Sequence, residues 1–535
     1  MTTVETHAPG TAAGVAGRGL SGVADWLTTT DHKKIGRLYL LSGMMFLAAV
    51  AVVGVLLGVD RADTSRALLD PGSLPQVLST YRVGLVMAAI APIVLGMAVA
   101  VVPLQVGARS LAFPRLVATG FWSWLIGTVV VVVSIASNGG PAGGNATFVA
   151  LFLTAHLLQL LGLLCAVVGL ATTILTTRAP GMNMRRVPVF TWSVLVACVG
   201  LLVALPVVAG NAIIAYVDYR YGREGFGGNR GISDLIGFGL TQPMTFLWAV
   251  PAFGFALEAL TTATRRRLAM RGAAFAGLGL LAVGAFTAVT QTPLDLPRNA
   301  FDQGLGDWLT DAVPFAFFHL LPVLGGLVVL AIGASSLRSV RPRLQSPMVF
   351  GLLGAGLAFV GVAGTALYNI GDAQLAGTVF EESMTLYVVY GTALAMLGAV
   401  VYWCPKLTGR ATADTKVLPL ALLGALGVVL AALPYAIAGF AKQPAAATQF
   451  SYSGPYQLWN IASAIGHLLV ALTVLGVVAM RLGALRGGAA AGDDPWDGQT
   501  LEWATSSPAP EANFADVHTV MSPEPLLDLK PGGQR

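Results

Sequence analysis

Residues 240–255 read LTQPMTFLWAVPAFGF, and this stretch indicates what kind of protein the chain forms. It carries no charged side chain, and its polar groups are two threonines and Gln242. Pro243 removes a backbone hydrogen bond and kinks a helix. Gln242 and Phe246 are four residues apart, so they share one face, and an amide on such a face is a typical helix–helix hydrogen-bonding group in membranes. The stretch predicts a kinked membrane-spanning helix.

The whole chain has the same apolar character. Its 535 residues are 55% hydrophobic and 11% charged, with a mean hydropathy of +0.74, whereas soluble domains are about 25% charged. The apolar runs are long and continuous, which favours helices over a barrel of short alternating strands. We therefore predict an all-α integral membrane protein, a bundle of twelve transmembrane helices. The runs centre near residues 47, 93, 126, 161, 202, 248, 282, 325, 358, 391, 427 and 469.

Basic residues predict the orientation of this bundle. The connections after the even-numbered spans hold 15 Lys and Arg, and those after the odd-numbered spans hold 8. Since cytoplasmic loops are enriched in Lys and Arg, we expect a multi-pass membrane protein with both termini cytoplasmic. The predicted parts are a disordered tail (1–30), the membrane domain (31–486) and a cytoplasmic C-terminal tail (487–535). The basic residues are dispersed over loop ends, so the expected partner is the lipid bilayer and not nucleic acid.

Titratable groups inside spans are candidates for chemistry, because a charge in the membrane is costly. Among histidines these are His156, His319 and His467. Each stands alone on its helix, without a second imidazole at helical spacing, whereas a haem or copper site needs several ligands that converge. We expect each to hydrogen-bond a neighbouring helix, with loose haem binding as the alternative, and predict no metal site.

Three acidic residues are further candidates. Glu381 and Glu382 lie near the outer end of the tenth span and point about 100° apart on a helix, so they do not form one paired site. We expect an interfacial pair that faces water or a partner, and the alternative is a proton or cation site. Glu258 precedes three consecutive arginines, and the simplest expectation is an interfacial ion pair.

Several longer segments resemble subunit I of the haem–copper oxidases, the cytochrome c oxidase type, in its bacterial form. The likeness covers nearly the whole chain and is in register with the twelve spans. The segments are TDHKKIGRLYLL, VPLQVGARSLAFPRL, RAPGMNMRRVPVFTWSVLV, SPMVFGLL, YWCPKLTGR and DDPWDGQTLEWATSSPAPEANF. The resemblance implies two haems and a copper ion as cofactors, oxygen reduction, and partners resembling oxidase subunits II and III.

The haem ligands of that family are histidines, and none stands at the matching positions here. Tyr81 falls at the first low-spin haem ligand, eleven residues before Pro92. Met384 falls at the high-spin haem ligand and Leu386 at the second low-spin ligand, when the tenth span is aligned on its Phe and Tyr. Tyrosine and methionine are known haem ligands in general, but leucine has no donor atom.

The copper site and the proton routes depart in the same way. In the sixth span the family has His-Pro-Glu-Val-Tyr, and this chain has Gln242, Pro243, Met244, Thr245 and Phe246. Gln242 replaces the copper-binding histidine, Met244 the glutamate of a proton route, and Phe246 the cross-linked tyrosine. The inner-loop aspartate of that route corresponds to Ser110, and the seventh span, whose alignment is loose, offers no histidine.

The sequence therefore leaves three functions open. The expectation is a cytochrome c oxidase subunit I-like paralogue without catalytic residues, with a structural, assembly or regulatory role in a respiratory complex. The first alternative is a divergent terminal oxidase that reduces oxygen with electrons from cytochrome c and pumps protons. The second is a transporter or channel on the same scaffold, with Glu381 and Glu382 in its outer vestibule. We predict no cofactor from the residues themselves, and haem and copper only by the resemblance.

Overall fold

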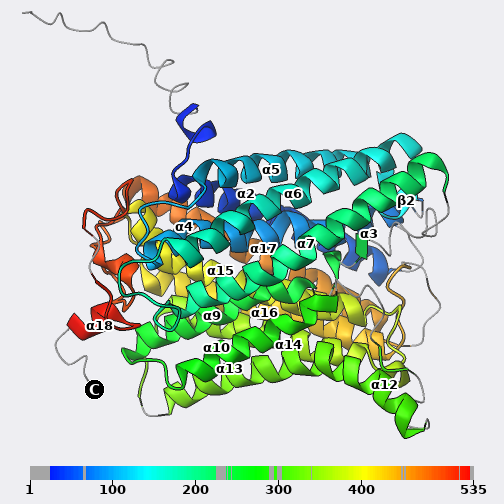
Figure 1. Ribbon diagram of the computed structural model, residues 1–535. Coiled ribbons are helices and arrows are strands. Elements are labelled where there is room, and N and C mark those ends of the chain that lie inside the picture. Colours follow the sequence, from blue (N-terminus) through cyan, green and yellow to red (C-terminus); the bar gives the residue numbers. More distant parts are fainter. Residues whose placement is uncertain are drawn as a thin grey trace, which may run out of the picture.

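Long apolar helices run back and forth through the computed structural model of this chain (Figure 1). It describes residues 24–63, 68–70, 72–223, 236–237, 239–241, 244–287, 295–297, 304–338, 340–447, 450, 454–516 and 519–529. Within these residues, eleven helices are long and apolar enough to span a membrane, and Arg271–Phe286 is a shorter apolar helix at the seventh predicted span. The prediction of a helical membrane bundle is confirmed.

Each predicted span corresponds to one helix or one run of joined helices. In chain order these are α2 (His32–Ala62), α3 (Leu74–Val83) with η1 (Gly84–Ile90) and α4 (Ala91–Gln105), α5 (Pro114–Ala136), α6 (Ala146–Thr176), α7 (Val189–Tyr221), α9 (Met244–Thr264), α10 (Arg271–Ala282) with η2 (Val283–Phe286), α12 (Leu305–Phe315) with η4 (Ala316–Leu320) and α13 (Leu321–Leu337), α14 (Ser346–Tyr368), α15 (Phe380–Thr408), α16 (Asp414–Phe440) and α17 (Tyr456–Gly487). The short elements are β1 (Gly139–Gly140), β2 (Gly143–Gly144), η5 (Gly371–Ala373), η6 (Leu501–Ala504) and α18 (Pro525–Leu529).

Prolines and polar caps define where helices begin and where they loosen. The Asp31 side chain accepts a hydrogen bond from the backbone N–H of Lys33 (3.0 Å) at the start of α2, which satisfies one of the free N–H groups of a helix N-terminus. Pro114 occupies the first position of α5, where its missing N–H is not needed. The π-helical turn η1 lies just before Pro92 and η4 just before Pro322, because proline leaves a carbonyl unpaired in the preceding turn.

Three spans form the centre of the bundle. The most apolar windows of Leu74–Gln105, α9 and α15 are 100%, 94% and 94% buried inside the protein, as expected for helices that are hydrophobic on all sides. The neighbouring pairs α5–α6, α14–α15 and α16–α17 pack as antiparallel hairpins, and α17 also packs on α2. The three central spans are therefore surrounded by other helices, and their side chains contact protein on all sides.

The C-terminal segment covers one end of the bundle, drawn in orange and red in Figure 1. We call this end the tail face and the opposite end the far face. Asn513 donates to the carbonyl of Ala108 (2.8 Å) and accepts from Lys33 (3.1 Å). The ammonium of Lys406 donates to the carbonyls of Asp493 (2.8 Å) and Thr505 (2.6 Å). The segment is thus held to the bundle by buried polar contacts.

The close approach of α16 and α17 yields a stability prediction. A Cβ atom at Gly466 would collide with the backbone of Ala431, whereas Gly483, also on α17, has open space beside it. We expect Gly466→Ala to lower the free energy of unfolding by about 1–3 kcal/mol, as overpacking does. Gly483→Ala should be neutral or stabilising by up to about 1 kcal/mol. Thermal unfolding of the purified variants in detergent measures both, and equal losses would contradict the close helix contact.

Candidate functional site

The described positions that the resemblance matches to haem ligands, to the proton-route glutamate and to the cross-linked tyrosine lie on the three central spans. Tyr81 on α3, Met244 and Phe246 on α9, and Met384 and Leu386 on α15 are each 5% exposed or less. Gln242 and Pro243, with the kink expected there, lie outside the described residues. The fold thus places five of the six positions in the interior, where a cofactor of this family would be held.

The donor atoms at these positions are few and already in contact with protein. Leu386 and Phe246 have none. The thioether of Met384 lies directly against Gly364 of α14, so closely that a Cβ there would collide with the sulfur. Met244 offers only a weak acceptor sulfur. Among these five side chains, the possible donor atoms are the hydroxyl of Tyr81 and the sulfurs of Met244 and Met384.

Tyr81 is part of a hydrogen-bonded group that we call the tyrosine–histidine triad, Tyr81, His467 and Tyr390. The hydroxyl of Tyr390 lies 2.9 Å from His467 Nδ1, and that of Tyr81 lies 3.4 Å from His467 Nε2. All three side chains are at most 1% exposed. A neutral imidazole accepts at one nitrogen and donates at the other, so both contacts form with neutral His467.

The triad joins helices from four parts of the chain. Tyr81 comes from α3, Tyr390 from α15 and His467 from α17, and the imidazole rests on α2, where a Cβ at Gly54 would lie 2.7 Å from the ring. Tyr390 follows Leu386 by four residues, so the two share a face of α15. His467 therefore lies between the helices that carry the two low-spin ligand positions.

An ion pair lies beside the triad at the far face and gives one of the two neighbouring acids a partner. The guanidinium of Arg61 on α2 is fully buried, and it lies 3.1 Å from the carboxylate of Glu382. It also donates to the carbonyl of Ala445 (2.8 Å) and lies over the Tyr435 ring at 5.3 Å. Glu382 thus supplies the counter-charge that a buried guanidinium needs, and it remains partly exposed.

Glu381 has a different environment. Its carboxylate accepts a hydrogen bond of 3.4 Å from the hydroxyl of Tyr368. It borders a small cavity of about 20 Å³ together with Glu382, Arg82 and Tyr81. The two acids have separate partners, as their angular separation predicts.

The expectation that Glu258 forms an interfacial ion pair with the following arginines is wrong. Glu258 is 3% exposed, and one carboxyl oxygen accepts from the backbone N–H of Phe190 (3.0 Å). Arg265 and Arg267 instead pair with Asp497 and Asp528 of the C-terminal segment. The acidic residues of the C-terminal segment are visible in the sequence as possible partners for these arginines. The sequence does not indicate that the segment packs against this end of the bundle.

The other two intramembrane histidines lie in separate surroundings. His156 Nδ1 lies 3.1 Å from Gln159 Oε1, whose amide donates to Thr128 (2.8 Å). His319 on η4 lies 3.4 Å from the amide of Asn369. Within the described residues, no three His, Cys, Asp or Glu side chains gather as metal ligands would.

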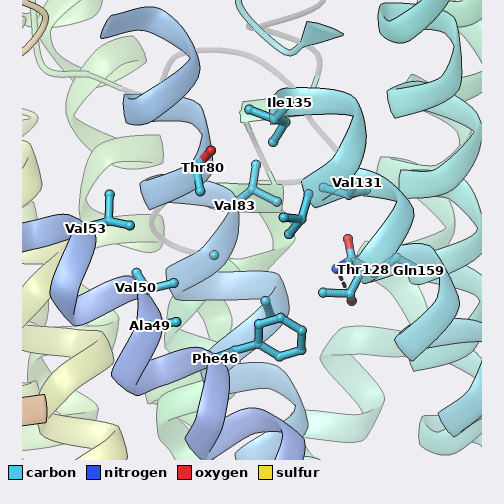
Figure 2. A pocket seen from close by; sticks show the side chains of 13 residues that line it. Phe46, Ala49, Val50, Val53, Thr80, Val83, Thr128, Val131, Ile135 and Gln159 are labelled. Carbon is cyan, nitrogen blue, oxygen red and sulfur yellow. Dashed lines mark hydrogen bonds between the residues drawn. The ribbon is translucent and has the colours of Figure 1, made fainter. Parts of the chain in front are cut away.

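A cavity of about 150 Å³ lies next to the Gln159–Thr128 pair, between α2, α3 with η1, α5 and α6 (Figure 2). Phe46, Val83 and Val131 form part of its apolar wall. Of the polar groups at its edge, Gln159 and Thr128 bond each other, and the hydroxyl of Thr80 donates to the carbonyl of Gln76. A mostly apolar cavity of this kind has no group free to ligate a metal.

The arrangement defines a multi-pass helical membrane protein with three buried central spans. The family model of cytochrome c and quinol oxidase polypeptide I matches residues 34–469. The chain belongs to this family, as the sequence resemblance predicts.

Relatives of known name agree with this assignment. Cytochrome c oxidase subunit 1 of Bacillus subtilis (strain 168) is 28% identical over 96% of this chain and 84% of its own length. The subunit 1 of Bacillus sp. (strain PS3) is 29% identical over 93% of this chain and 82% of its own length. Haem–copper oxidase subunit I+III of Aeropyrum pernix is 27% identical over 94% of this chain, which matches 62% of that longer protein.

The fold has a counterpart among solved structures. A cryo-EM structure of a haem–copper terminal oxidase dimer superposes with a TM-score of 0.60 over 85% of this chain and 84% of that chain, at 14% identity. At this identity the likeness concerns the fold alone, and the chemistry must be argued from the residues.

The triad provides a test of how the interior is held together. Tyr390→Phe removes the hydroxyl that bonds His467 Nδ1 and leaves a buried nitrogen unpaired, so unfolding should become easier by about 1–3 kcal/mol. The matched control is Tyr39→Phe, because Tyr39 is equally buried and its hydroxyl has no hydrogen-bond partner among the described residues. We expect no loss there. A Tyr390→Phe protein as stable as Tyr39→Phe in thermal unfolding would show that the triad contributes nothing.

Proposed function

We propose that this chain is a non-catalytic member of the oxidase subunit I family, with a structural, assembly or regulatory role in a respiratory membrane complex. The observation that carries the proposal is the chemistry at the low-spin haem positions. Leu386 has no donor atom, and the hydroxyl of Tyr81 is in contact with His467 at 3.4 Å. A haem held there would have to separate Tyr81 from His467 and would still find no second ligand at position 386.

The high-spin haem and copper positions support the same conclusion. The sulfur of Met384 lies against Gly364 of α14. A thioether is also a weaker electron-pair donor than the imidazole that the family has at this position. Met244 and Phe246 supply no proton and no strong copper ligand. Gln242, known from sequence only, offers an amide where the family has imidazole. The described residues therefore do not fit two haems and a copper ion.

The polar groups of the interior also argue against a conducting path. At the far face, polar side chains extend inward through Arg61 and Glu382 to Tyr390. Residues 393–401 of α15 are then all apolar, a length of about 14 Å at 1.5 Å per residue. On this central helix, polar groups resume only at Tyr402, whose hydroxyl bonds Thr262.

The family relationship supports the proposed setting. We infer that the chain lies in a bacterial plasma membrane with its tail face in the cytoplasm, since the more basic connections lie at that end. The Aeropyrum pernix relative is named as a fusion of subunits I and III. By analogy, we propose partners that resemble oxidase subunits II and III, held by surfaces that this chain keeps while its interior departs from the family.

Haem and copper content tests the proposal directly. Protein purified from membranes should show sub-stoichiometric haem in a pyridine haemochrome spectrum and no copper by metal analysis, because the ligand atoms are absent. It should also consume no oxygen with reduced cytochrome c. The Bacillus subtilis subunit 1, expressed in the same host, controls for haem supply. Two haems and one copper per chain, or oxygen consumption lost in Met384→Ala, would overturn the proposal in favour of a divergent oxidase.

A further inference from the structure

Two carboxyl groups are buried together at the tail face, one from each side of the contact between the bundle and the C-terminal segment. Glu258 lies near the end of α9 and Glu502 lies in η6, and they are 3% and 0% exposed. Neither forms an ion pair within the described residues. Two ionised carboxylates in this position would be costly, since each would lose its hydration and repel the other.

A single amide links the two carboxyl groups. The nitrogen of Gln105 on α4 donates to Glu258 Oε1 and to Glu502 Oε1, the latter at 3.1 Å. The orientation of this amide is set by Thr191, whose hydroxyl donates to Gln105 Oε1 (2.6 Å). Both carboxyl groups thus lie within hydrogen-bond reach of the same nitrogen atom, one on each of its two N–H bonds.

The remaining contacts leave one oxygen atom without a partner. Glu258 Oε2 accepts from the backbone N–H of Phe190 (3.0 Å), and Glu502 Oε1 accepts from the indole of Trp403 (3.0 Å). Glu502 Oε2 is buried without a hydrogen-bond partner among the described residues. An unpartnered buried carboxylate oxygen is unfavourable when charged, so this oxygen points to a bound proton.

The charged groups around the pair are engaged elsewhere. Arg271 exerts an electrostatic attraction on Glu258, but its ion pair is with Glu524, at 2.9 Å. Lys406 acts on Glu502 but donates to backbone carbonyls of the tail. Tyr402, the remaining titratable neighbour, bonds Thr262 and adds no positive charge. The cations lower the repulsion without neutralising either carboxylate by direct contact.

We infer that Glu258 and Glu502 form one proton-binding site, in which the pair holds one proton, on Glu502, when the C-terminal segment is docked on the bundle. The site is complete only in the docked state, because each part of the chain supplies one carboxyl group. Docking of the segment is therefore coupled to proton uptake. This inference concerns the tail face and does not depend on whether the interior binds haem.

The direction of the pH dependence follows from Glu502. Burial raises the pKa of its carboxyl group, and the hydrogen bonds from Trp403 and Gln105 offset only part of that rise. Once the segment leaves the bundle, Glu502 regains water and its ordinary pKa, so the docked state binds more protons than the undocked state. Docking is then fully favoured below the ordinary pKa and weakens as pH rises through the raised one, by at most about tenfold per pH unit for one proton.

Glu524 requires a separate control, because burial also raises the pKa of its carboxyl group while Arg271 opposes the rise. It could add a pH dependence of the same sign. Glu502→Gln removes the titration of the proposed site but keeps the amide-sized side chain, and Glu524→Gln removes the other. Asp528→Asn changes a tail acid that pairs with the exposed Arg267 and takes no part in the site.

Hydrogen exchange of the full-length protein in detergent tests the coupling. The observable is amide protection in residues 499–516, expressed as the ratio of wild type to Glu502→Gln at each pH, which cancels the intrinsic pH dependence of exchange. We expect this ratio to fall about tenfold or more between pH 6 and 9. Glu258→Gln should show the same pH dependence of protection as Glu502→Gln. Glu524→Gln and Asp528→Asn should keep the slope of the wild type.

Two results would overturn the inference. A ratio that stays flat over this range would show that no proton is linked to docking. Loss of protection in Glu502→Gln at every pH would show that the ionised carboxylate holds the segment. Repeating the series in sodium and potassium buffers of equal ionic strength distinguishes a proton from an alkali cation: we expect the same midpoint in both, and a midpoint that moves with the cation counts against a proton site.

Discussion

The three central spans touch neither water nor lipid over most of their length, so each polar side chain on them needs a partner on another helix. A membrane interior offers no water to replace a missing hydrogen bond. This constraint accounts for three groups of polar side chains that each join several helices. The tyrosine–histidine triad joins α2, α3, α15 and α17, Arg61 and Glu382 join α2 to α15, and Gln105 joins α4 to both the end of α9 and the C-terminal segment.

In this family the interior is expected to be held together by cofactors as well as by side chains. Here the triad supplies cross-links where the resemblance places a low-spin haem. His467 contributes an imidazole to that region from α17, whereas the family ligands come from the second and tenth spans. We interpret the triad as the side-chain packing that allows the scaffold to remain closed without that cofactor.

Much of the fold could be predicted from the sequence, because its dominant signal is the length of apolar runs. Span lengths and positions depend on local composition, and the seventh predicted span corresponds to the shorter apolar helix Arg271–Phe286. The site was harder, since the triad unites residues up to 386 positions apart and no local pattern marks such a pairing. The ion pair predicted for Glu258 is wrong for the same reason. The nearby arginines pair with acids of the C-terminal segment, and Glu258 accepts hydrogen bonds from Gln105 and from the backbone of Phe190.

The central claim is that side chains, and not a haem, fill the space between α3, α15 and α17. A cryo-EM density map of the purified protein tests it most directly at the triad. The account predicts continuous side-chain density in which the hydroxyl of Tyr390 meets His467 Nδ1 near 2.9 Å, with Tyr81 on the other side of the imidazole. Planar density for a macrocycle between Tyr81 and Leu386, with the His467 ring displaced toward solvent or lipid, would contradict it.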